Sequence, residues 1–276
     1  MVEKTLSTIG ILEAAKEVDV CPLCSLWSKY ERKLLDYFLS NEASMDPDIR
    51  SKVVKAVGFC SRHMNLLYQE AFSSRWSEDG LGYAQYMRDV CIKLLDALIK
   101  IDNEANKSSK AKAKTMKLFL KRREPLKPLD SIKGKMLRLL SGELVCPICE
   151  MLFEADRIRA GTLIRMLDDP EFREQFIMSN HVCLPHFVLL THQLSHRKKR
   201  DTLELILLPL IQMELTYIKK VTDQLSERIR KYSWEYRNET LGEECEAQKR
   251  ALELVVGCEG LYPKSKKDAS WLDFEE

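Results

Sequence analysis

The feature that most constrains the fold of this chain is a cysteine–histidine pattern that occurs twice. The first copy is Cys21-Pro22-Leu23-Cys24 followed by Cys60-Ser61-Arg62-His63, and the second is Cys146-Pro147-Ile148-Cys149 followed by Cys183-Leu184-Pro185-His186. Each copy reads CPxC … CxxH, with 35 residues between the two pairs in the first copy and 33 in the second. Three thiolates and one imidazole form a donor set that suits tetrahedral zinc. The repetition predicts two metal sites per chain.

We expect the two motifs of one copy to share one ion. The predicted ligands are Cys21, Cys24, Cys60 and His63 at the first site, and Cys146, Cys149, Cys183 and His186 at the second. Four protein ligands leave no open position for water, which favours a structural role. An iron–sulfur cluster is the alternative cofactor, because histidine can replace cysteine as a cluster ligand.

One further histidine competes for the second site. His181 lies two residues before Cys183 and is an alternative to His186 as its fourth ligand. The first copy has Gly58 at the equivalent position, so the repetition favours His186.

The apolar residues recur with a helical period throughout the chain. After the first CPxC motif they fall three or four positions apart, as in Trp27, Tyr30 and Leu34, which predicts one face of a helix. Proline after the first cysteine of each CPxC motif favours the first turn of a helix. No strand pattern is evident. We therefore expect an all-α fold: two tandem helical repeat domains, each held by its own Cys3His site, plus a long C-terminal helix.

The duplication suggests the domain boundaries. We expect a first CPxC … CxxH helical domain over 1–105, a basic linker over 106–135 and a second such domain over 136–226. A charged C-terminal helix over 227–257 and a mobile tail over 258–276 follow. The length suits two domains of ordinary size.

Charge and cysteine usage bear on the compartment and on partners. The formal net charge of +2 conceals a basic segment, because the stretch from Lys107 to Arg138 holds twelve Lys or Arg residues against two acidic ones. No secretory signal and no membrane-spanning run is visible. Nine cysteines, six of them in the repeated pattern, favour metal sites in a reducing cytoplasm over disulfides.

The double pattern also carries a family resemblance. Its CxxH segments, Gly58-Phe59-Cys60-Ser61-Arg62-His63 and His181-Val182-Cys183-Leu184-Pro185-His186, open predicted helices. In this the chain resembles an uncharacterised bacterial and archaeal family of helical proteins with spaced Cys/His sets. The resemblance covers both copies and implies the architecture; it implies no activity.

The sequence favours binding over catalysis. It contains none of the motifs GxGxxG, GxxxxGK[ST], GxSxG or HExxH. The first hypothesis is a zinc-stabilised helical protein that engages nucleic acid or a ribonucleoprotein through its basic linker, with contacts from Lys112, Lys114, Lys121, Arg122 and Arg123. The alternative is a protein–protein adaptor that uses the C-terminal helix and tail. A further alternative is a sensor in which oxidation of the thiolates, or of an iron–sulfur cluster, releases the metal.

Overall fold

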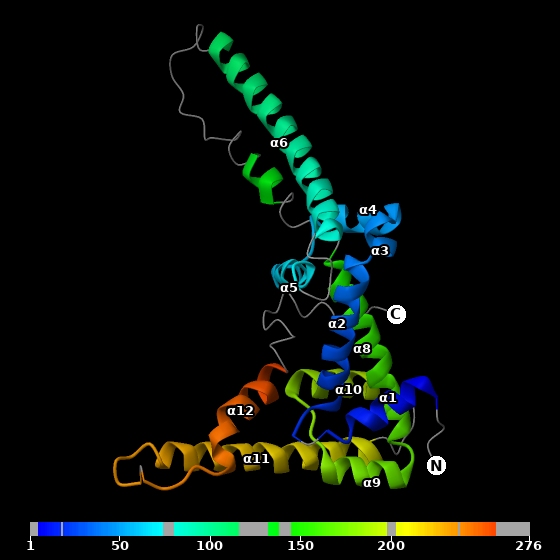
Figure 1. The fold of residues 1–276 in the computed structure, drawn as a ribbon, viewed down its shortest axis with the longest axis vertical. Coiled ribbons are helices and arrows are strands. Elements are labelled where there is room, and N and C mark those ends of the chain that lie inside the picture. Colours follow the sequence, from blue (N-terminus) through cyan, green and yellow to red (C-terminus); the bar gives the residue numbers. More distant parts are fainter. Residues whose placement is uncertain are drawn as a thin grey trace. The chain divides into compact units, whose positions relative to one another are not determined.

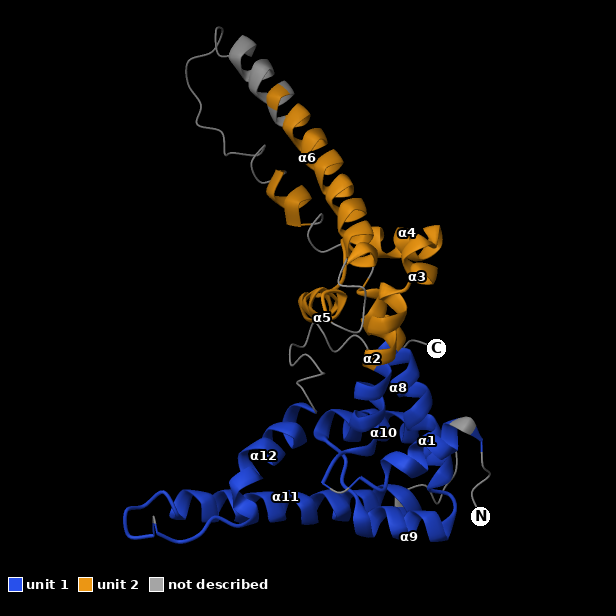
Figure 2. Ribbon diagram, in the orientation of Figure 1, with its two compact units in different colours: residues 1–30, 152–276 blue, residues 31–151 orange. Residues whose placement is uncertain are grey.

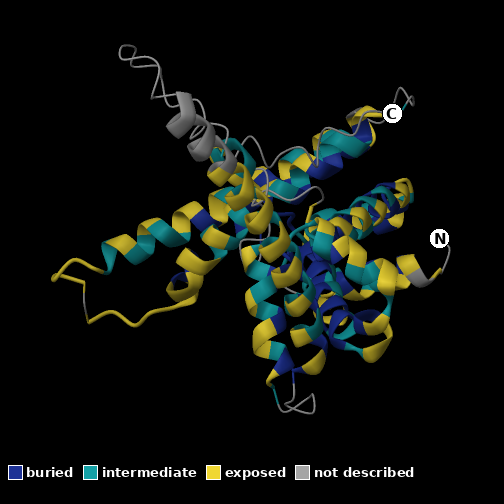
Figure 3. Ribbon diagram, turned by 90° about the horizontal axis from the view of Figure 1, so that it is seen from above, coloured by how far each residue is buried: buried dark blue, intermediate teal, exposed yellow. Residues whose placement is uncertain are grey.

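The structure is a computed structural model that describes residues 5–17, 19–73, 80–115, 132–137, 145–197, 203–236 and 238–257. Within these ranges the chain forms helices joined by turns, and no strand occurs (Figure 1). The predicted all-α class is confirmed. The apolar spacing seen in the sequence becomes amphipathic helices, along which buried and exposed residues alternate (Figure 3).

The chain divides into two compact units that interleave along the sequence (Figure 2). Unit 1 comprises residues 1–30 and 152–276, and unit 2 comprises residues 31–151. This division differs from the expected boundaries, 1–105 and 136–226. The borders fall inside two helices, α2 (Pro22–Leu39) and α8 (Pro147–Met166), because the two ends of each helix belong to different cores.

Unit 1 is built on the first part of α2 and on most of α8. The other helices of this unit are α1 (Leu6–Ala14), α9 (Pro170–Ser179), α10 (Leu184–Ser195), α11 (Leu208–Arg230) and α12 (Ala247–Val256), with a π-helical turn at Leu203–Leu207 before α11. Its core gathers buried aliphatic and aromatic side chains from α1, α8, α9, α10 and α11, among them Leu163, Phe176 and Leu190. Three cysteines of the repeated motifs, Cys21, Cys24 and Cys183, belong to this same apolar core.

Unit 2 contains the rest of α2, the start of α8, a short helix at residues 132–137 and the helices α3 (Asn41–Met45), α4 (Pro47–Lys55), α5 (Ser61–Ala71) and α6 (Leu81–Thr115). Phe38, Phe59 and Tyr86 meet edge to face or tilted, with ring centroids 5.3–6.4 Å apart. The guanidinium of Arg50 donates two hydrogen bonds, of 2.6 and 2.8 Å, to the carboxylate of Asp89 and so ties α4 to α6.

The prediction of one long helix over 227–257 is wrong. Helix α11 ends at Arg230, an irregular segment follows, and a short 3₁₀ turn at Glu243–Glu246 leads into α12. Serine, asparagine, threonine and glycine interrupt the helix-forming residues in this segment, which lowers its helix propensity. The ammonium group of Lys231 closes the loop by donating to the Thr240 carbonyl at 2.8 Å and to the Glu244 carboxylate at 2.7 Å.

Candidate metal centres

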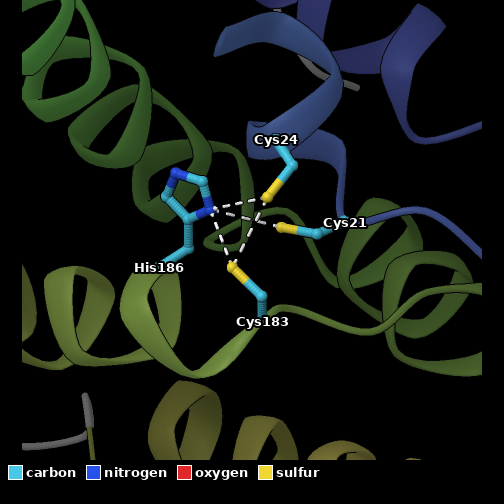
Figure 4. Close-up of side chains that lie close together, drawn as sticks. All are labelled: Cys21, Cys24, Cys183 and His186. Atoms are coloured by element: carbon cyan, nitrogen blue, oxygen red, sulfur yellow. Dashed lines mark hydrogen bonds between the residues drawn. The ribbon is translucent and has the colours of Figure 1, made fainter. Parts of the chain in front are cut away.

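The first candidate centre, cluster A, consists of Cys21, Cys24, Cys183 and His186 in unit 1 (Figure 4). The His186 Nδ1 atom lies 3.5, 3.4 and 3.1 Å from the three sulfur atoms in that order. The Sγ atoms of Cys24 and Cys183 are 3.5 Å apart. All four side chains are buried. Cluster A is therefore a converging set of four donors inside an apolar core.

The second candidate centre, cluster B, consists of Cys60, His63, Cys146 and Cys149 in unit 2. The His63 Nδ1 atom lies 3.2 Å from Cys60 Sγ, 3.5 Å from Cys146 Sγ and 3.3 Å from Cys149 Sγ. The Sγ atoms of Cys60 and Cys149 are 3.7 Å apart. The histidine is buried, whereas the three cysteines are partly exposed.

The helix starts position these ligands. Pro22 and Pro147 open α2 and α8, so each CPxC motif sits on the first turn of a helix, as predicted. Cys60 and Cys183 are the N-caps of α5 and α10, which places each CxxH histidine on the first turn that follows. Unpaired N–H groups and the helix dipole stabilise thiolates at such positions.

The expected pairing of the motifs is wrong. Each cluster joins the CPxC motif of one copy to the CxxH motif of the other, so the ligands of a cluster are separated by up to 165 residues. The reason lies in the length of α2. Glu31 contacts His63, yet it lies seven residues beyond Cys24, about 10 Å along the helix axis. A histidine bound to Glu31 cannot also reach the Cys24 sulfur.

Each ligand histidine is held by a carboxylate. The Nε2 atom of His63 lies 3.0 Å from Oε1 of Glu31, and the Nε2 atom of His186 lies 2.9 Å from Oδ2 of Asp156. A metal-binding histidine usually bonds a carboxylate through its other ring nitrogen, which fixes the tautomer and leaves Nδ1 free for the metal. Both clusters show this arrangement.

The sequence contains a signal for these carboxylates that was missed. Glu31 and Asp156 each lie seven residues after the second cysteine of a CPxC motif, so both copies read CPxC-x6-[Glu/Asp]. Two turns of helix separate the cysteine from the acid. Each of α2 and α8 therefore supplies two cysteines to one cluster and the supporting carboxylate to the histidine of the other.

Electrostatics around cluster B favour a bound cation. Hydrogen bonds to its neighbouring thiolates, together with burial, raise the pKa of the Cys149 thiol, because a second negative charge beside Cys60 is repelled. Burial acts to lower the pKa of His63, but hydrogen bonds with the thiolates and with Glu31 outweigh it and raise the pKa to about 11. Without a metal ion, only part of the cluster can ionise; a dication removes that repulsion.

The carboxylate at cluster B is itself anchored. The Arg62 guanidinium donates two hydrogen bonds to Glu31, of 2.9 and 2.8 Å. Burial acts to raise the pKa of Glu31, but the hydrogen bonds from His63 and Arg62 dominate and lower it to about 2. At cluster A the position of Arg62 is taken by Pro185.

The dimensions of both clusters suit a single ion. A tetrahedral zinc ion with Zn–S bonds of about 2.3 Å and Zn–N bonds of about 2.0 Å holds its sulfurs about 3.8 Å apart, and sulfur about 3.5 Å from nitrogen. The sulfur–sulfur distances given above are 3.5 and 3.7 Å, and the sulfur–nitrogen distances run from 3.1 to 3.5 Å. In an iron–sulfur cluster, several irons and sulfides lie between the ligands and hold the donor atoms farther apart.

The other candidate residues lie outside the clusters. His181 stacks on Tyr217, with centroids 3.7 Å apart, rather than joining cluster A. Cys91 and Cys245 are exposed and lie in neither cluster. Two of the predicted nucleic-acid contacts, Lys112 and Lys114, lie at the end of α6, where the side chains are not described. The other three, Lys121, Arg122 and Arg123, lie outside the described residues.

A buried acid next to cluster A was not anticipated from the sequence. The carboxylate of Glu214 on α11 accepts a 2.6 Å hydrogen bond from the backbone N–H of Val182, one residue before Cys183. Burial raises the pKa of Glu214 to about 8. Periodicity alone places this residue on α11 without indicating which side chains it faces.

Fold and site together define a class: an all-α protein with two Cys3His clusters, each able to hold one metal ion. None of the described helices is long and apolar enough to cross a membrane. The chain belongs to a family of unknown function, DUF6062, whose model matches residues 1–260. No curated protein and no solved structure matches the sequence.

Proposed function

We propose that the chain binds two zinc ions, one in each cluster, and that these ions stabilise a helical protein that works by binding a partner. The observation that carries the zinc assignment is the geometry: three sulfurs and one Nδ1 converge within tetrahedral contact in both clusters. The carboxylates on Nε2 add the outer hydrogen bonds typical of zinc-bound histidine.

A structural role follows from the donor count. Catalytic zinc keeps a position open for water or substrate, whereas four protein ligands close the coordination sphere. Structural zinc contributes on the order of 10 kcal/mol to folding. That amount is comparable to the whole stability of a typical domain, so each unit is expected to depend on its ion.

Metal content is the first measurement. The protein is purified without oxygen, and its zinc and iron are determined by elemental analysis together with an absorption spectrum. Two zinc ions per chain without visible bands support the proposal. Iron with charge-transfer bands contradicts it and favours an iron–sulfur or redox function.

The two CPxC helices support an internal duplication. Both carry buried apolar residues at matching positions, Leu23 and Ile148 between the cysteines and Trp27 and Leu152 one turn later. With the acid seven residues after the second cysteine, the match extends over three helical turns. We propose that the chain consists of two related halves that exchange their CxxH motifs.

The partner we propose is nucleic acid, alone or in a ribonucleoprotein. The support is the charge of the segment from Lys107 to Arg138, with twelve basic residues against two acidic ones. Such a density neutralises phosphates and makes binding steeply dependent on salt.

Fluorescence anisotropy with labelled single-stranded and double-stranded RNA at increasing salt tests this partner. The test variant replaces Lys112, Lys114, Lys121, Arg122 and Arg123 with glutamine and should lose binding. A matched control replaces five exposed lysines elsewhere, Lys16, Lys33, Lys52, Lys219 and Lys249, and should keep it. Equal affinity of the two variants contradicts this function.

A protein–protein adaptor is the second candidate. Its support is the segment after α11, where Tyr232 and Trp234 are 70% and 76% exposed, which is unusual for such large apolar side chains. The Arg228 guanidinium lies over the Tyr232 ring, 5.1 Å from its centroid. A nuclease-resistant pull-down that is lost in the Tyr232→Ser/Trp234→Ser variant favours this candidate over nucleic acid.

A further inference from the structure

The two clusters share one ligand set but differ in exposure. In cluster A the three cysteines are 4%, 1% and 1% exposed, whereas all three cysteines of cluster B are partly exposed. The chemical reactivity of a zinc-bound thiolate depends on whether a reagent can reach the sulfur. The three cysteines of cluster B are partly exposed as residues, while those of cluster A belong to a core of buried apolar residues.

We infer that cluster B is a thiol-oxidation site, at which a hydroperoxide converts two zinc-bound thiolates to a disulfide and releases the ion, while cluster A keeps its metal. This inference rests on the proposed zinc binding and names its regulation. In cluster B the sulfurs of Cys60 and Cys149 lie 3.7 Å apart. A disulfide needs about 2.0 Å, a change that side-chain rotation can supply as the sulfenic sulfur is attacked.

The reaction balances with a hydroperoxide as the two-electron oxidant. One thiolate attacks the peroxide O–O bond and becomes a sulfenic acid, and the departing hydroxide takes a proton to form water. The second thiolate attacks the sulfenic sulfur, forms the S–S bond and expels a second hydroxide, which is also protonated. Two thiolates, one hydrogen peroxide and two protons give one disulfide and two waters. Zinc then retains only two protein ligands and dissociates.

Cluster B links α5, α2 and the start of α8 within unit 2, and loss of the ion removes this link. Cys60 caps α5 by accepting from the backbone N–H of His63, and the His63 ring bonds Glu31 on α2. The CPxC end of α8 reaches this network through Cys146 and Cys149. Oxidation therefore loosens the contact between α5, α2 and the start of α8.

The test uses the full-length, zinc-loaded protein in which the cysteines outside the clusters are replaced: Cys91→Ser, Cys245→Ser and Cys258→Ser. Hydrogen peroxide is added, zinc release is followed with a chromogenic chelator, and disulfides are mapped by mass spectrometry of peptides. One zinc per chain is expected to leave at least about tenfold faster than the other, with a disulfide among Cys60, Cys146 and Cys149. Equal release rates, oxidation first in cluster A, or retention of both ions overturns the inference.

A second measurement needs no oxidant. Iodoacetamide is added to the same zinc-loaded protein, and the alkylated cysteines are identified over time. The cysteines of cluster B should be modified first, and a lead by Cys21, Cys24 or Cys183 contradicts the inference. If the protein carries no zinc at all, the proposed function fails first; two zinc ions that both resist oxidation refute the oxidation site alone.

Discussion

Clusters A and B use the same four donors, the same helix starts and the same carboxylate support, yet they occupy different surroundings. The cysteines of cluster A belong to the apolar core of unit 1, and its histidine is fully buried. The cysteines of cluster B are partly exposed, and the histidine-bound carboxylate there accepts hydrogen bonds from Arg62. The comparison teaches that a local motif can specify a ligand set while the packing around it specifies how accessible the metal is.

The largest effect is expected from tests of the pairing itself. Replacing Cys21 and Cys183 with serine removes two ligands from cluster A and should leave one zinc per chain. Replacing Cys60 and Cys146 disables cluster B alone and should also leave one. Replacing Cys21 and Cys60 affects both clusters, and elemental analysis should find none. If this last variant keeps one zinc while the other two keep none, the motifs pair within each copy.

The buried acid beside cluster A should make stability depend on pH. Because the folded chain holds the proton of Glu214 up to about pH 8, whereas the unfolded chain releases it near 4.5, the acid favours folding at low pH and this contribution is lost as pH rises to about 8. Glu214→Gln still accepts from Val182 but cannot ionise. At saturating zinc it should be more stable than the parent at pH 8, by on the order of a few kcal/mol.

Unfolding curves in urea at pH 5 and pH 8 measure this difference. The stability gap between Glu214→Gln and the parent should widen with pH. A gap that is the same at both pH values would show that the carboxyl group is ionised in the folded chain.

Substitution of each histidine-bound carboxylate should lower the zinc affinity of one cluster only. Glu31→Gln should weaken zinc binding at cluster B, and Asp156→Asn should weaken it at cluster A, each by about 10- to 100-fold, because the histidine loses its orienting partner. Competition with a zinc chelator measures both affinities. Glu154→Gln, exposed on the same helix as Asp156, is the matched control and should change neither. Loss at the opposite cluster would contradict the contacts described above.

The smallest effects are expected at two helical glycines, one in each unit. A Cβ atom on Gly82 would lie 2.8 Å from the Leu39 carbonyl oxygen in unit 2, so Gly82→Ala should destabilise the protein by about 1–3 kcal/mol. A Cβ atom on Gly161 in unit 1 meets nothing closer than 3.8 Å, so Gly161→Ala should stabilise it by about 0.5–1 kcal/mol through helix propensity. Urea unfolding measures the change in stability of each variant. Changes of the same sign in both variants would contradict the contacts described for the two glycines.

Local chemistry explains what could be predicted from the sequence. Proline at a helix start, a glycine at the end of α4 and apolar residues three or four positions apart are signals within one turn of chain, so they indicate helices before any packing is known. Gly58, with φ of 98°, follows α4. The acid seven residues after each CPxC motif is also a local signal. Its role in holding the ligand histidine, however, is evident only from the tertiary contact between the two side chains.

The sequence by itself determined the helical class, the eight donor residues and their positions on the first turns of helices. Only the tertiary structure decided which CPxC motif meets which CxxH motif, which cluster is buried, and where Glu214 lies. The reason is physical: caps and periodicity act over a few residues, whereas pairing depends on how helices far apart in the sequence bury their apolar faces. Two copies of the CPxC and CxxH patterns offer two pairings that local signals do not distinguish, and packing selects between them.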